Sequence, residues 1–380
     1  MKQTEQVRLI EQTLARLDAR AADMADRTHR QPVAAYTRAR RLERERTALF
    51  RALPQVVGFA SQVARPGDFL THAHTGVPIL VARGEDGALG AFINACRHRG
   101  TRLLDAPCGE GMRRIVCPYH SWVYAADGTL LTVTHETGFP DLDKSERGLV
   151  RLPLAERHGL VFVRPMPGEP LDIDAWLGPL MTDLESFGFG RHVAYRPEVR
   201  ERPINWKLMI DTSYESYHFK TVHRESIYPM FLDNTGVFDW SEPHARMVLP
   251  KRTIRSLADA DPATWRIREH ANLIYGIFPS TLFLVMDDHA MVVSAFPLAV
   301  DRTVLVSAML IPEDPAGDPK ATAHWDRNHD IFWNAIDEDI AMAEAMQATL
   351  GSGANEELLL GRFEHLIAKF HGVVERLAAE

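Results

Sequence analysis

Two short segments of the chain each carry one cysteine and one histidine. The first reads Cys96-Arg97-His98 and the second reads Cys117-Pro118-Tyr119-His120. Thiolate and imidazole groups are good ligands for transition metals, so four of them in two loops can hold a metal centre. Zinc is the simplest candidate, because a Cys2His2 set binds it well. Zinc fingers, however, usually draw both cysteines from one loop and both histidines from another.

The pairing of the ligands in this sequence favours an iron–sulfur cluster. Each loop supplies one Cys and one His, whereas in a Rieske [2Fe–2S] cluster two cysteines hold one iron and two histidines hold the other. This ligand set raises the reduction potential above that of an all-cysteine cluster. We therefore predict a Rieske cluster on Cys96, His98, Cys117 and His120, with structural zinc as the alternative.

A second pair of histidines, His218 and His223, lies further along the chain. The sequence contains 17 histidines, so this pair alone is a weak signal. A Rieske cluster, however, only transfers electrons and needs an acceptor. Two histidines and one carboxylate on one face of Fe(II) leave positions open for O2. The pair therefore indicates a mononuclear iron site that requires a carboxylate from elsewhere.

The segment 336–344 offers four carboxylates on a predicted helix. Its apolar residues follow the spacing i, i+4 and i+7, which is typical of a buried helix face. Asp339 neighbours this stripe and is predicted to face inward, while Asp337 and Glu338 are expected to tilt away. A buried carboxylate needs a positive partner, which an iron ion would provide. The stripe consists of Ile336, Ile340 and Ala343.

Across nearly its whole length the sequence resembles the α subunits of the Rieske non-haem iron (aromatic-ring-hydroxylating) oxygenases. The two Cys-His loops are similar to the cluster loops of that family. The segment from Asn205-Trp206-Lys207 to His223 is similar to its iron-binding segment, and Glu338-Asp339 to its later acidic pair. The resemblance implies that iron sits on His218, His223 and Asp339.

The resemblance also assigns a role to a carboxylate that precedes the histidines. Glu215 occupies the position of a family carboxylate, often Asp, that bridges a cluster histidine of one subunit and an iron histidine of its neighbour. Such a carboxylate would fix the imidazole tautomers and raise their basicity. Asp211, one helical turn earlier, is expected to line the pocket or to support His218 or His223.

The implied fold is of the α+β class, with a Rieske-type β-sandwich followed by a helix-grip (Bet v 1-like) catalytic domain. In the latter an antiparallel sheet folds around a long helix. Apolar runs separated by turn signals agree with this order, and the segments 173–187, 324–350 and 355–374 are expected to be helical. The predicted parts are N-terminal helices packing on the catalytic domain (1–50), the cluster domain (51–165) and the catalytic domain (166–380).

The resemblance implies a terminal oxygenase that uses O2 and electrons from NAD(P)H, delivered through a reductase or ferredoxin. We expect it to oxidise an aromatic or largely apolar organic compound. Oxidative demethylation or cleavage of a quaternary ammonium compound is the alternative, because Glu at position 215 also occurs in relatives that attack such compounds. Expected pocket residues are Met209, Asp211, Thr212, Phe278, Phe332 and Ile336, and a cation cage could use Trp240, Tyr275, Phe283 and Trp333.

The family resemblance further implies a head-to-tail homotrimer, possibly with a β subunit. In such a ring each cluster serves the iron of its neighbour. A non-enzymatic electron carrier that keeps only the cluster is a second hypothesis, which the intact His218, His223 and Asp339 set disfavours.

Composition excludes several other classes of function. The formal net charge is −8 at pH 7, which disfavours nucleic acid as a partner. No apolar run approaches the roughly 18 residues that span a bilayer, and the first residues show no apolar signal core. The three cysteines, two of them predicted ligands, leave no pair for a disulfide. We therefore expect a cytoplasmic protein without membrane contact.

Overall fold

The computed structural model describes residues 1–379 and divides the chain into two compact units. The small unit contains residues 46–176 and 190–194, and the large unit contains residues 1–45, 177–189 and those from 195 onward. The end of the small unit at residue 176 lies beyond the predicted domain boundary at 165. Arg157, on a strand of the small unit, forms an ion pair of 2.8 Å with Asp174, and this contact ties the following segment to that unit.

Two antiparallel sheets form the body of the small unit. One has the strand order β10-β5-β4-β3-β6 and the other the order β11-β12-β2. A hairpin at Asp86-Gly87 joins β4 and β5, where Gly87 has a φ of 80°. The strands are β2 (Gln55–Phe59), β3 (Phe69–His72), β4 (Ile79–Arg83), β5 (Leu89–Ile93), β6 (Cys108–Gly109), β10 (Arg151–Leu152), β11 (Leu154–Arg157) and β12 (Leu160–Val163).

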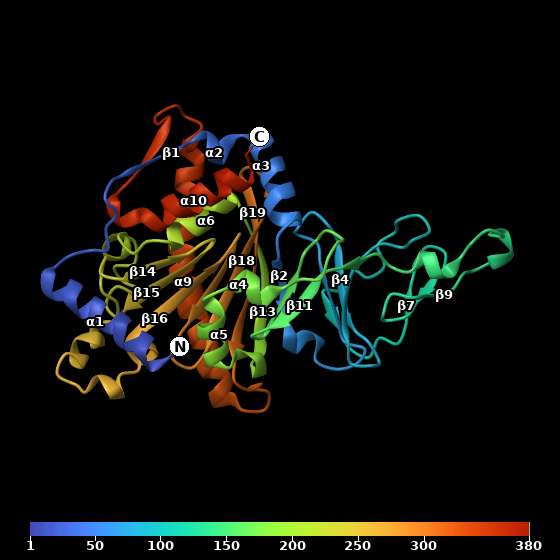
Figure 1. Cartoon of the computed structure of the whole chain (residues 1–380), viewed down its shortest axis with the longest axis horizontal. Helices are drawn as coiled ribbons and strands as arrows, with labels where there is room; N and C mark the ends of the chain where they lie inside the picture. The colour runs from blue at the N-terminus through green and yellow to red at the C-terminus, as the bar shows by residue number, and fades with distance from the viewer. Residues whose placement is uncertain (380) are drawn as a thin grey trace. The chain divides into compact units, whose positions relative to one another are not determined.

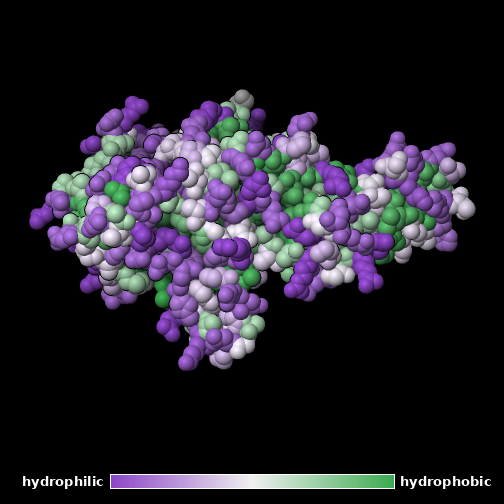
Figure 2. All heavy atoms as spheres, turned by 60° about the horizontal axis from the view of Figure 1, so that its bottom comes forward, coloured by the Kyte–Doolittle hydropathy of each residue, from purple (hydrophilic) through white to green (hydrophobic). Residues whose placement is uncertain are grey.

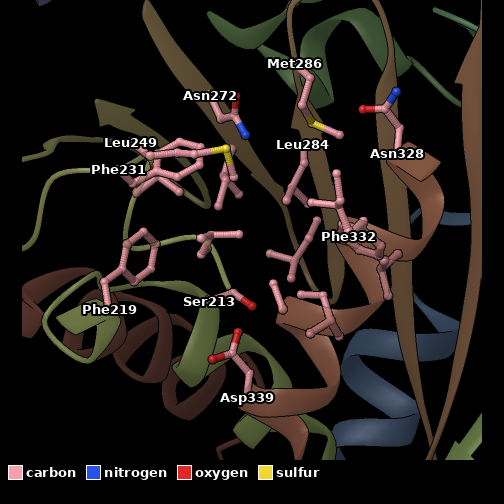
Figure 3. Close-up of a pocket in the computed structure, with 18 of the residues that line it drawn as sticks. Ser213, Phe219, Phe231, Leu249, Asn272, Leu284, Met286, Asn328, Phe332 and Asp339 are labelled. Atoms are coloured by element: carbon pink, nitrogen blue, oxygen red, sulfur yellow. The ribbon is translucent and has the colours of Figure 1, made fainter. Parts of the chain in front are cut away.

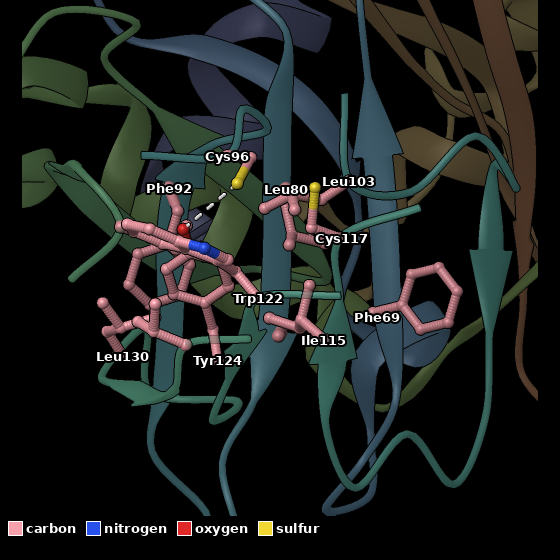
Figure 4. Packing of buried hydrophobic residues seen from close by; sticks show 13 residues of the cluster. Phe69, Leu80, Phe92, Cys96, Leu103, Ile115, Cys117, Trp122, Tyr124 and Leu130 are labelled. Carbon is pink, nitrogen blue, oxygen red and sulfur yellow. Dashed lines mark hydrogen bonds between the residues drawn. The ribbon is translucent and has the colours of Figure 1, made fainter. Parts of the chain in front are cut away.

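A third, three-stranded sheet of the small unit lies next to the two predicted cluster loops. It has the order β7-β8-β9, with β7 (Ile115–Val116), β8 (Val123–Tyr124) and β9 (Leu130–Thr132). The second Cys-His segment connects β7 to β8, and a short turn connects β8 to its antiparallel partner β9. Figure 4 shows the buried side chains beneath these loops, which include Cys96, Cys117, Trp122 and Tyr124. The short helix α4 (Ile173–Leu177) follows at the end of this unit.

A seven-stranded antiparallel sheet organises the large unit, in the order β13-β19-β18-β17-β16-β15-β14. Its central strands are buried along nearly their full length, because helices and loops cover them. The strands are β13 (Val193–Arg202), β14 (Val237–Ser241), β15 (His244–Pro250), β16 (Ala271–Ile277), β17 (Thr281–Val285), β18 (Ala290–Ala299) and β19 (Arg302–Ile311).

The long helix α9 (Pro319–Leu350) lies beside this sheet within the large unit (Figure 1). The Asp318 side chain caps its first turn by accepting hydrogen bonds from two backbone N–H groups, and Pro319 fits the first helical position. Its buried face includes Phe332, Ile336 and Asp339, so the predicted inward orientation of Asp339 is confirmed. Among the described residues no helix is both long and apolar enough to cross a membrane.

The remaining helices of the large unit are shorter. α6 (Trp206–Ser213) begins at Asn205, whose side chain accepts a hydrogen bond from the N–H of Lys207. The others are α1 (Gln3–Ala19), α2 (Ala34–Thr37), α3 (Ala39–Glu45), α5 (Leu180–Phe187), α7 (Phe219–Val222), α8 (Ile267–His270) and α10 (His365–Leu377).

Two segments depart from the predicted secondary structure. The segment 173–187 is two helices, α4 and α5, because Gly178-Pro179 interrupts the helical backbone between them. The segment 355–374 begins with a strand, β20 (Glu357–Leu360), which pairs with β1 (His29–Pro32) before α10 starts. This pairing joins segments more than 300 residues apart, so local periodicity could not reveal it.

Candidate metal centres and substrate cavity

Three predicted iron ligands meet in the large unit. His218 and His223 flank the single turn of α7, and Asp339 projects from α9. The Nε2 atoms of the two histidines lie 3.1 Å apart, and Asp339 Oδ1 lies 3.1 Å from His218 Nε2 and 3.0 Å from His223 Nε2. Two ligands at right angles and about 2.1 Å from a metal are about 3.0 Å apart. The three atoms therefore match one face of an octahedral metal centre.

The electrostatics of this triad favour a bound cation. Burial alone would lower the pKa of His218, but hydrogen bonds with Asp339 and Glu215 outweigh it and raise the pKa to about 10. The pKa of His223 is raised for the same kind of reason. Burial would raise the pKa of Asp339, yet its hydrogen bonds with the two histidines lower it. A divalent metal ion can replace the protons that this site otherwise retains.

Glu215 contacts the first of the two histidines. Its Oε1 atom accepts a hydrogen bond from His218 Nδ1, and its Oε2 atom accepts from the backbone N–H groups of Tyr217 and His218. This contact fixes the tautomer that leaves His218 Nε2 free for a metal. The other half of the predicted bridge belongs to a neighbouring subunit and stays a prediction.

Glu338 contacts the second histidine, against the expectation that it tilts away. Its Oε2 atom lies 2.7 Å from His223 Nδ1 and accepts a hydrogen bond of 2.6 Å from Ser226 Oγ. The expectation failed because the apolar stripe indicates only which face of α9 is buried. Glu338 is half-buried at the border of that face, and its long side chain extends to His223. Asp337 follows the prediction, since it is exposed and pairs with Arg202 at 2.7 Å.

Asp211 supports neither histidine. Its carboxylate accepts a hydrogen bond of 2.6 Å from Tyr36 Oη and lies 2.9 Å from His371 Nε2. It therefore ties α6 to α2 and α10. The predicted contact with His218 or His223 is wrong because Asp211 faces the N-terminal segment and the C-terminal helix, whose packing on α6 the sequence did not indicate.

Lys207 anchors α6 inside the large unit. Its Nζ lies 2.9 and 2.7 Å from the two carboxylate oxygens of Glu45, and both side chains are fully buried. Glu45 also accepts hydrogen bonds from Trp206 Nε1 and Arg41 Nε. Sequence reasoning missed this network because its members are about 160 residues apart.

A cavity of about 290 Å³ adjoins the metal triad. Figure 3 shows the Asp339 carboxylate and Ser213 at one end and the amides of Asn272 and Asn328 at the other. The walls between them are mainly apolar and include Phe219, Phe231 and Phe332, together with Leu249, Leu284 and Met286. A small organic molecule could therefore lie with one end at the metal and its other end among polar groups.

The predicted pocket residues divide into two groups. Met209, Thr212, Phe332 and Ile336 line the cavity, as predicted, whereas Asp211 and Phe278 do not. Phe278 packs instead against Phe370 of α10, with ring centroids 6.0 Å apart.

The predicted cation cage is wrong, because none of its four residues lines the cavity. Successive side chains of a strand point to opposite faces, so Ile274 of β16 and Leu284 of β17 face the cavity while Tyr275 and Phe283 face away. Tyr275 donates a hydrogen bond to Asp183, and Phe283 packs against Phe189. The ring centre of Trp333 lies 3.6 Å from the guanidinium of Arg200. Trp240 lines another surface hollow, together with Arg246.

The predicted cluster ligands form a second site, in the small unit. The two loops turn at Gly100, with a φ of 76°, and at Ser121, with a φ of 53°. Tyr124 Oη lies 3.4 Å from Cys96 Sγ and accepts a hydrogen bond from a backbone N–H of the same loop. Trp122 stacks on the His98 ring, with centroids 4.9 Å apart and planes at 10°. Both loops are thus held by local contacts.

The ligand atoms of this site suit an iron–sulfur cluster. The Nδ1 atoms of His98 and His120 are buried without a hydrogen-bond partner in the described chain, and the two rings lie 4.7 Å apart. Cys96 and Cys117 are buried free thiols, whereas Cys108 is exposed. Because a buried nitrogen without a partner is costly, these Nδ1 atoms are suited to ligate iron.

Comparisons with known proteins agree with both sites. Residues 188–380 match the family described as "Ring hydroxylating alpha subunit (catalytic domain)", and residues 54–143 match the "Rieske [2Fe-2S] domain". The second match decides between the two metals considered for the Cys-His loops, in favour of the iron–sulfur cluster.

Similar proteins include oxygenase subunits with quaternary ammonium substrates in their names. The carnitine monooxygenase oxygenase subunit of Acinetobacter baumannii is 27% identical over 363 residues, which cover 90% of this chain and 94% of that protein. The glycine betaine monooxygenase oxygenase subunit of Chromohalobacter salexigens is 28% identical over 336 residues (78% and 74%). The structure of the quaternary ammonium Rieske monooxygenase CntA with L-carnitine has the same fold, with a TM-score of 0.78 at 24% identity over 94% and 97% of the chains.

Proposed function

We propose, from the premise that the chain belongs to the family of Rieske ring-hydroxylating oxygenase α subunits, that its substrate is a quaternary ammonium compound. The reaction is the O2-dependent hydroxylation of a carbon bonded to the quaternary nitrogen. This places the alternative substrate class suggested by the sequence ahead of the aromatic class. Similarity to a carnitine monooxygenase subunit over 90% of this chain, and to a glycine betaine monooxygenase subunit over 78% of it, supports this choice.

The charge and the aromatic walls of the cavity carry the proposal. Its lining includes the carboxylates Glu215, Asp287, Asp288 and Asp339 against one ammonium group, Lys251. With a divalent cation bound, the lining still has a net negative charge. The faces of aromatic rings attract quaternary ammonium groups, and Phe219, Phe231 and Phe332 line the cavity. An apolar, negatively charged cavity suits a methylated cation.

The residues described above fit both metal groups. His218, His223 and Asp339 would hold the mononuclear iron, and Cys96, His98, Cys117 and His120 the [2Fe–2S] cluster. When bound, the cluster supplies electrons and the iron activates O2. In the overall reaction the substrate, O2, two electrons and two protons give the hydroxylated substrate and water. The hydroxylated carbon then loses its bond to nitrogen, which leaves a carbonyl compound, a tertiary amine and a proton.

The protein's own side chains position the reactants. Glu215 and Glu338 fix the two imidazoles so that both Nε2 atoms point at Asp339. The hydroxyls of Thr212 and Ser213 both donate to the carbonyl oxygen of Met209, which leaves the reacting end without a free hydroxyl donor from these two residues. The apolar walls exclude water and keep the ammonium group beside the metal.

Delivery of electrons requires a partner, and we propose a reductase or ferredoxin that uses NAD(P)H. A surface patch of the small unit suits a protein contact, since Val116, Tyr119 and Leu131 are exposed apolar residues close to the second cluster loop. Figure 2 shows apolar residues among polar ones on the surface of the small unit. We keep the homotrimer, with or without a β subunit, as part of this proposal.

Oxidation of an aromatic compound is the second candidate. The largely apolar wall from Phe219 to Leu284 favours it, because a neutral ring would also be desolvated there. A neutral ring, however, brings no positive charge to the carboxylates that line the cavity. The two candidates therefore differ in whether a positive charge on the substrate improves binding.

A substrate panel distinguishes the two candidates. The purified holoenzyme, a compatible reductase and NADH are incubated with trimethylammonium compounds and with aromatic compounds of similar size. We expect NADH-coupled O2 uptake with the former, together with release of a tertiary amine and an aldehyde, detected by mass spectrometry. Hydroxylated ring products from the aromatic compounds, with no amine release from the cations, would refute the proposal.

A further inference from the structure

The end of the cavity opposite Asp339 contains an amide without a hydrogen-bond partner. Asn272 lies on β16 two residues before Ile274, so both side chains project from the same face of the strand into the cavity. Its Oδ1 atom is enclosed by protein and has no hydrogen bond with the described chain. Figure 3 shows its Nδ2 atom directed toward the interior of the cavity. A ligand in the cavity can supply the hydrogen-bond partner that this amide lacks.

Apart from the exposed Asp287, the other polar groups at this end have partners within the protein. Asn328 Nδ2 donates to the carbonyl oxygen of His324 at 3.0 Å. The two carboxylate oxygens of Asp288 lie 2.6 Å from His289 Nδ1 and 3.1 Å from His324 Nε2. Lys251 Nζ donates to two backbone carbonyl oxygens at 3.3 and 3.4 Å. These contacts hold the surrounding side chains in place and leave the Asn272 amide available.

The surroundings of Asn272 also limit what can approach it. Leu249 is its register partner on β15, and Leu249, Leu284 and Met286 form the apolar walls nearby. A molecule that extends from the metal triad to the amide therefore lies along apolar walls. The occupant that fits is an elongated molecule, apolar along its length, with an oxygen at the end remote from the reacting carbon.

We propose that Asn272 is a specificity-determining residue that binds an oxygen atom on the tail of the substrate. Nδ2 donates to a carboxylate or hydroxyl oxygen, and a half turn about χ2 presents Oδ1 to a hydroxyl proton instead. The shared chemistry is an oxygen-bearing tail, and the experiment distinguishes its two forms. This inference extends the proposed function, because the head of the same molecule is the quaternary ammonium group.

Binding to two series of compounds tests the proposal. One series has a trimethylammonium head and the other a benzene ring, and each has a short alkyl chain that ends in a carboxylate, a hydroxyl or a methyl group. Dissociation constants are measured by calorimetry on the anaerobic holoenzyme without reductase. We compare the wild type with Asn272→Leu, which has a similar size but no polar atom, and with Asn334→Leu, the same exchange at an exposed position of α9 that does not line the cavity.

We expect the wild type and Asn334→Leu to bind an oxygen-ended compound on the order of tenfold more tightly than the methyl-ended one. Asn272→Leu should lose this preference while its melting temperature and cluster absorption stay unchanged. Asn272→Asp should still accept the hydroxyl tail but should reject the carboxylate tail, because two negative charges repel each other. Persistence of the wild-type preference in Asn272→Leu, or absence of any preference or binding in both series, overturns the proposal.

The design separates this inference from the function on which it rests. If only the benzene series binds, the quaternary ammonium proposal fails, whereas the role of Asn272 is still decided by the tails within that series. If the trimethylammonium series binds equally well with every tail, the proposed function survives and the role of Asn272 is rejected.

Discussion

The two metal sites of this protein are built in different ways. The cluster ligands come from two loops within 25 residues of sequence, 96–120, and local turns at Gly100 and Ser121 shape both loops. The iron triad instead joins α7 to α9, where Asp339 lies far along the chain from the histidines. The cluster site therefore depends mainly on local backbone geometry, whereas the iron site depends on long-range packing.

This difference has consequences for the residues that support each site. Around the cluster, Tyr124 and Trp122 come from the same β-hairpin region as the ligands. Around the iron triad, support comes from Glu338 on α9 and, through α6, from Glu45 and His371. Substitutions distant in sequence should therefore perturb the iron site and leave the cluster intact.

The largest expected effect comes from removal of the triad carboxylate. Changes to residues that hydrogen-bond to metal ligands typically cost about 10- to 100-fold. Asp339→Ala removes a ligand itself, so it should lower product formation by more than about 100-fold. The cluster absorption should be unchanged, because its ligands lie in the other unit. Product formation and visible spectra of the same preparation check both statements.

Asp337→Ala is the matched control for this prediction. Asp337 lies on the same helix but is exposed, and it pairs with Arg202. The control should retain wild-type activity and spectrum. If Asp337→Ala were inactive and Asp339→Ala active, the assignment of the third iron ligand would be wrong.

Much of the cluster site could be predicted from the sequence, since the interleaved spacing of Cys and His identifies all four predicted ligands and the two loops that carry them. For the iron site the apolar stripe on α9 identified Asp339, because burial follows helical periodicity. The partners of Asp211 and Lys207 could not be predicted, since they depend on how remote segments pack. Two residues of the predicted cation cage, Tyr275 and Phe283, failed for a related reason, because the alternation of side chains along β16 and β17 places them on the opposite face of the sheet.

The next effect concerns the buried ion pair beneath α6. Glu45→Ala would leave Lys207 as an unpaired buried charge, and breaking such a pair typically costs about 3–5 kcal/mol. We expect the thermal transition of the large unit to move to lower temperature, as measured by calorimetry, while the reduced cluster keeps its spectrum until the small unit unfolds.

A control for the ion pair is available on the surface. Arg30 and Glu357 form an exposed pair at 3.3 Å, and such pairs contribute about 0–1 kcal/mol. Glu357→Ala should therefore change the transition little. Equal shifts for Glu45→Ala and Glu357→Ala would mean that the buried pair does not stabilise α6.

The smallest of the three effects is expected from Glu338→Gln. The amide keeps the size of the side chain but removes the charge that supports His223, so iron(II) affinity should fall about 10- to 100-fold. Competition with a chelator measures this affinity, with Asp337→Asn as the control. An unchanged affinity would show that the contact between Glu338 and His223 Nδ1 does not contribute to metal binding.

The central claim is that one chain holds both a Rieske cluster and a separate mononuclear iron. Iron and acid-labile sulfide analysis of the anaerobically purified wild-type protein tests it most directly. We expect about three irons and about two sulfides per chain, because the cluster contains two of each and the triad one further iron. Two irons per chain with an intact cluster would indicate an electron carrier without a mononuclear site, and zinc without sulfide would contradict the account as a whole.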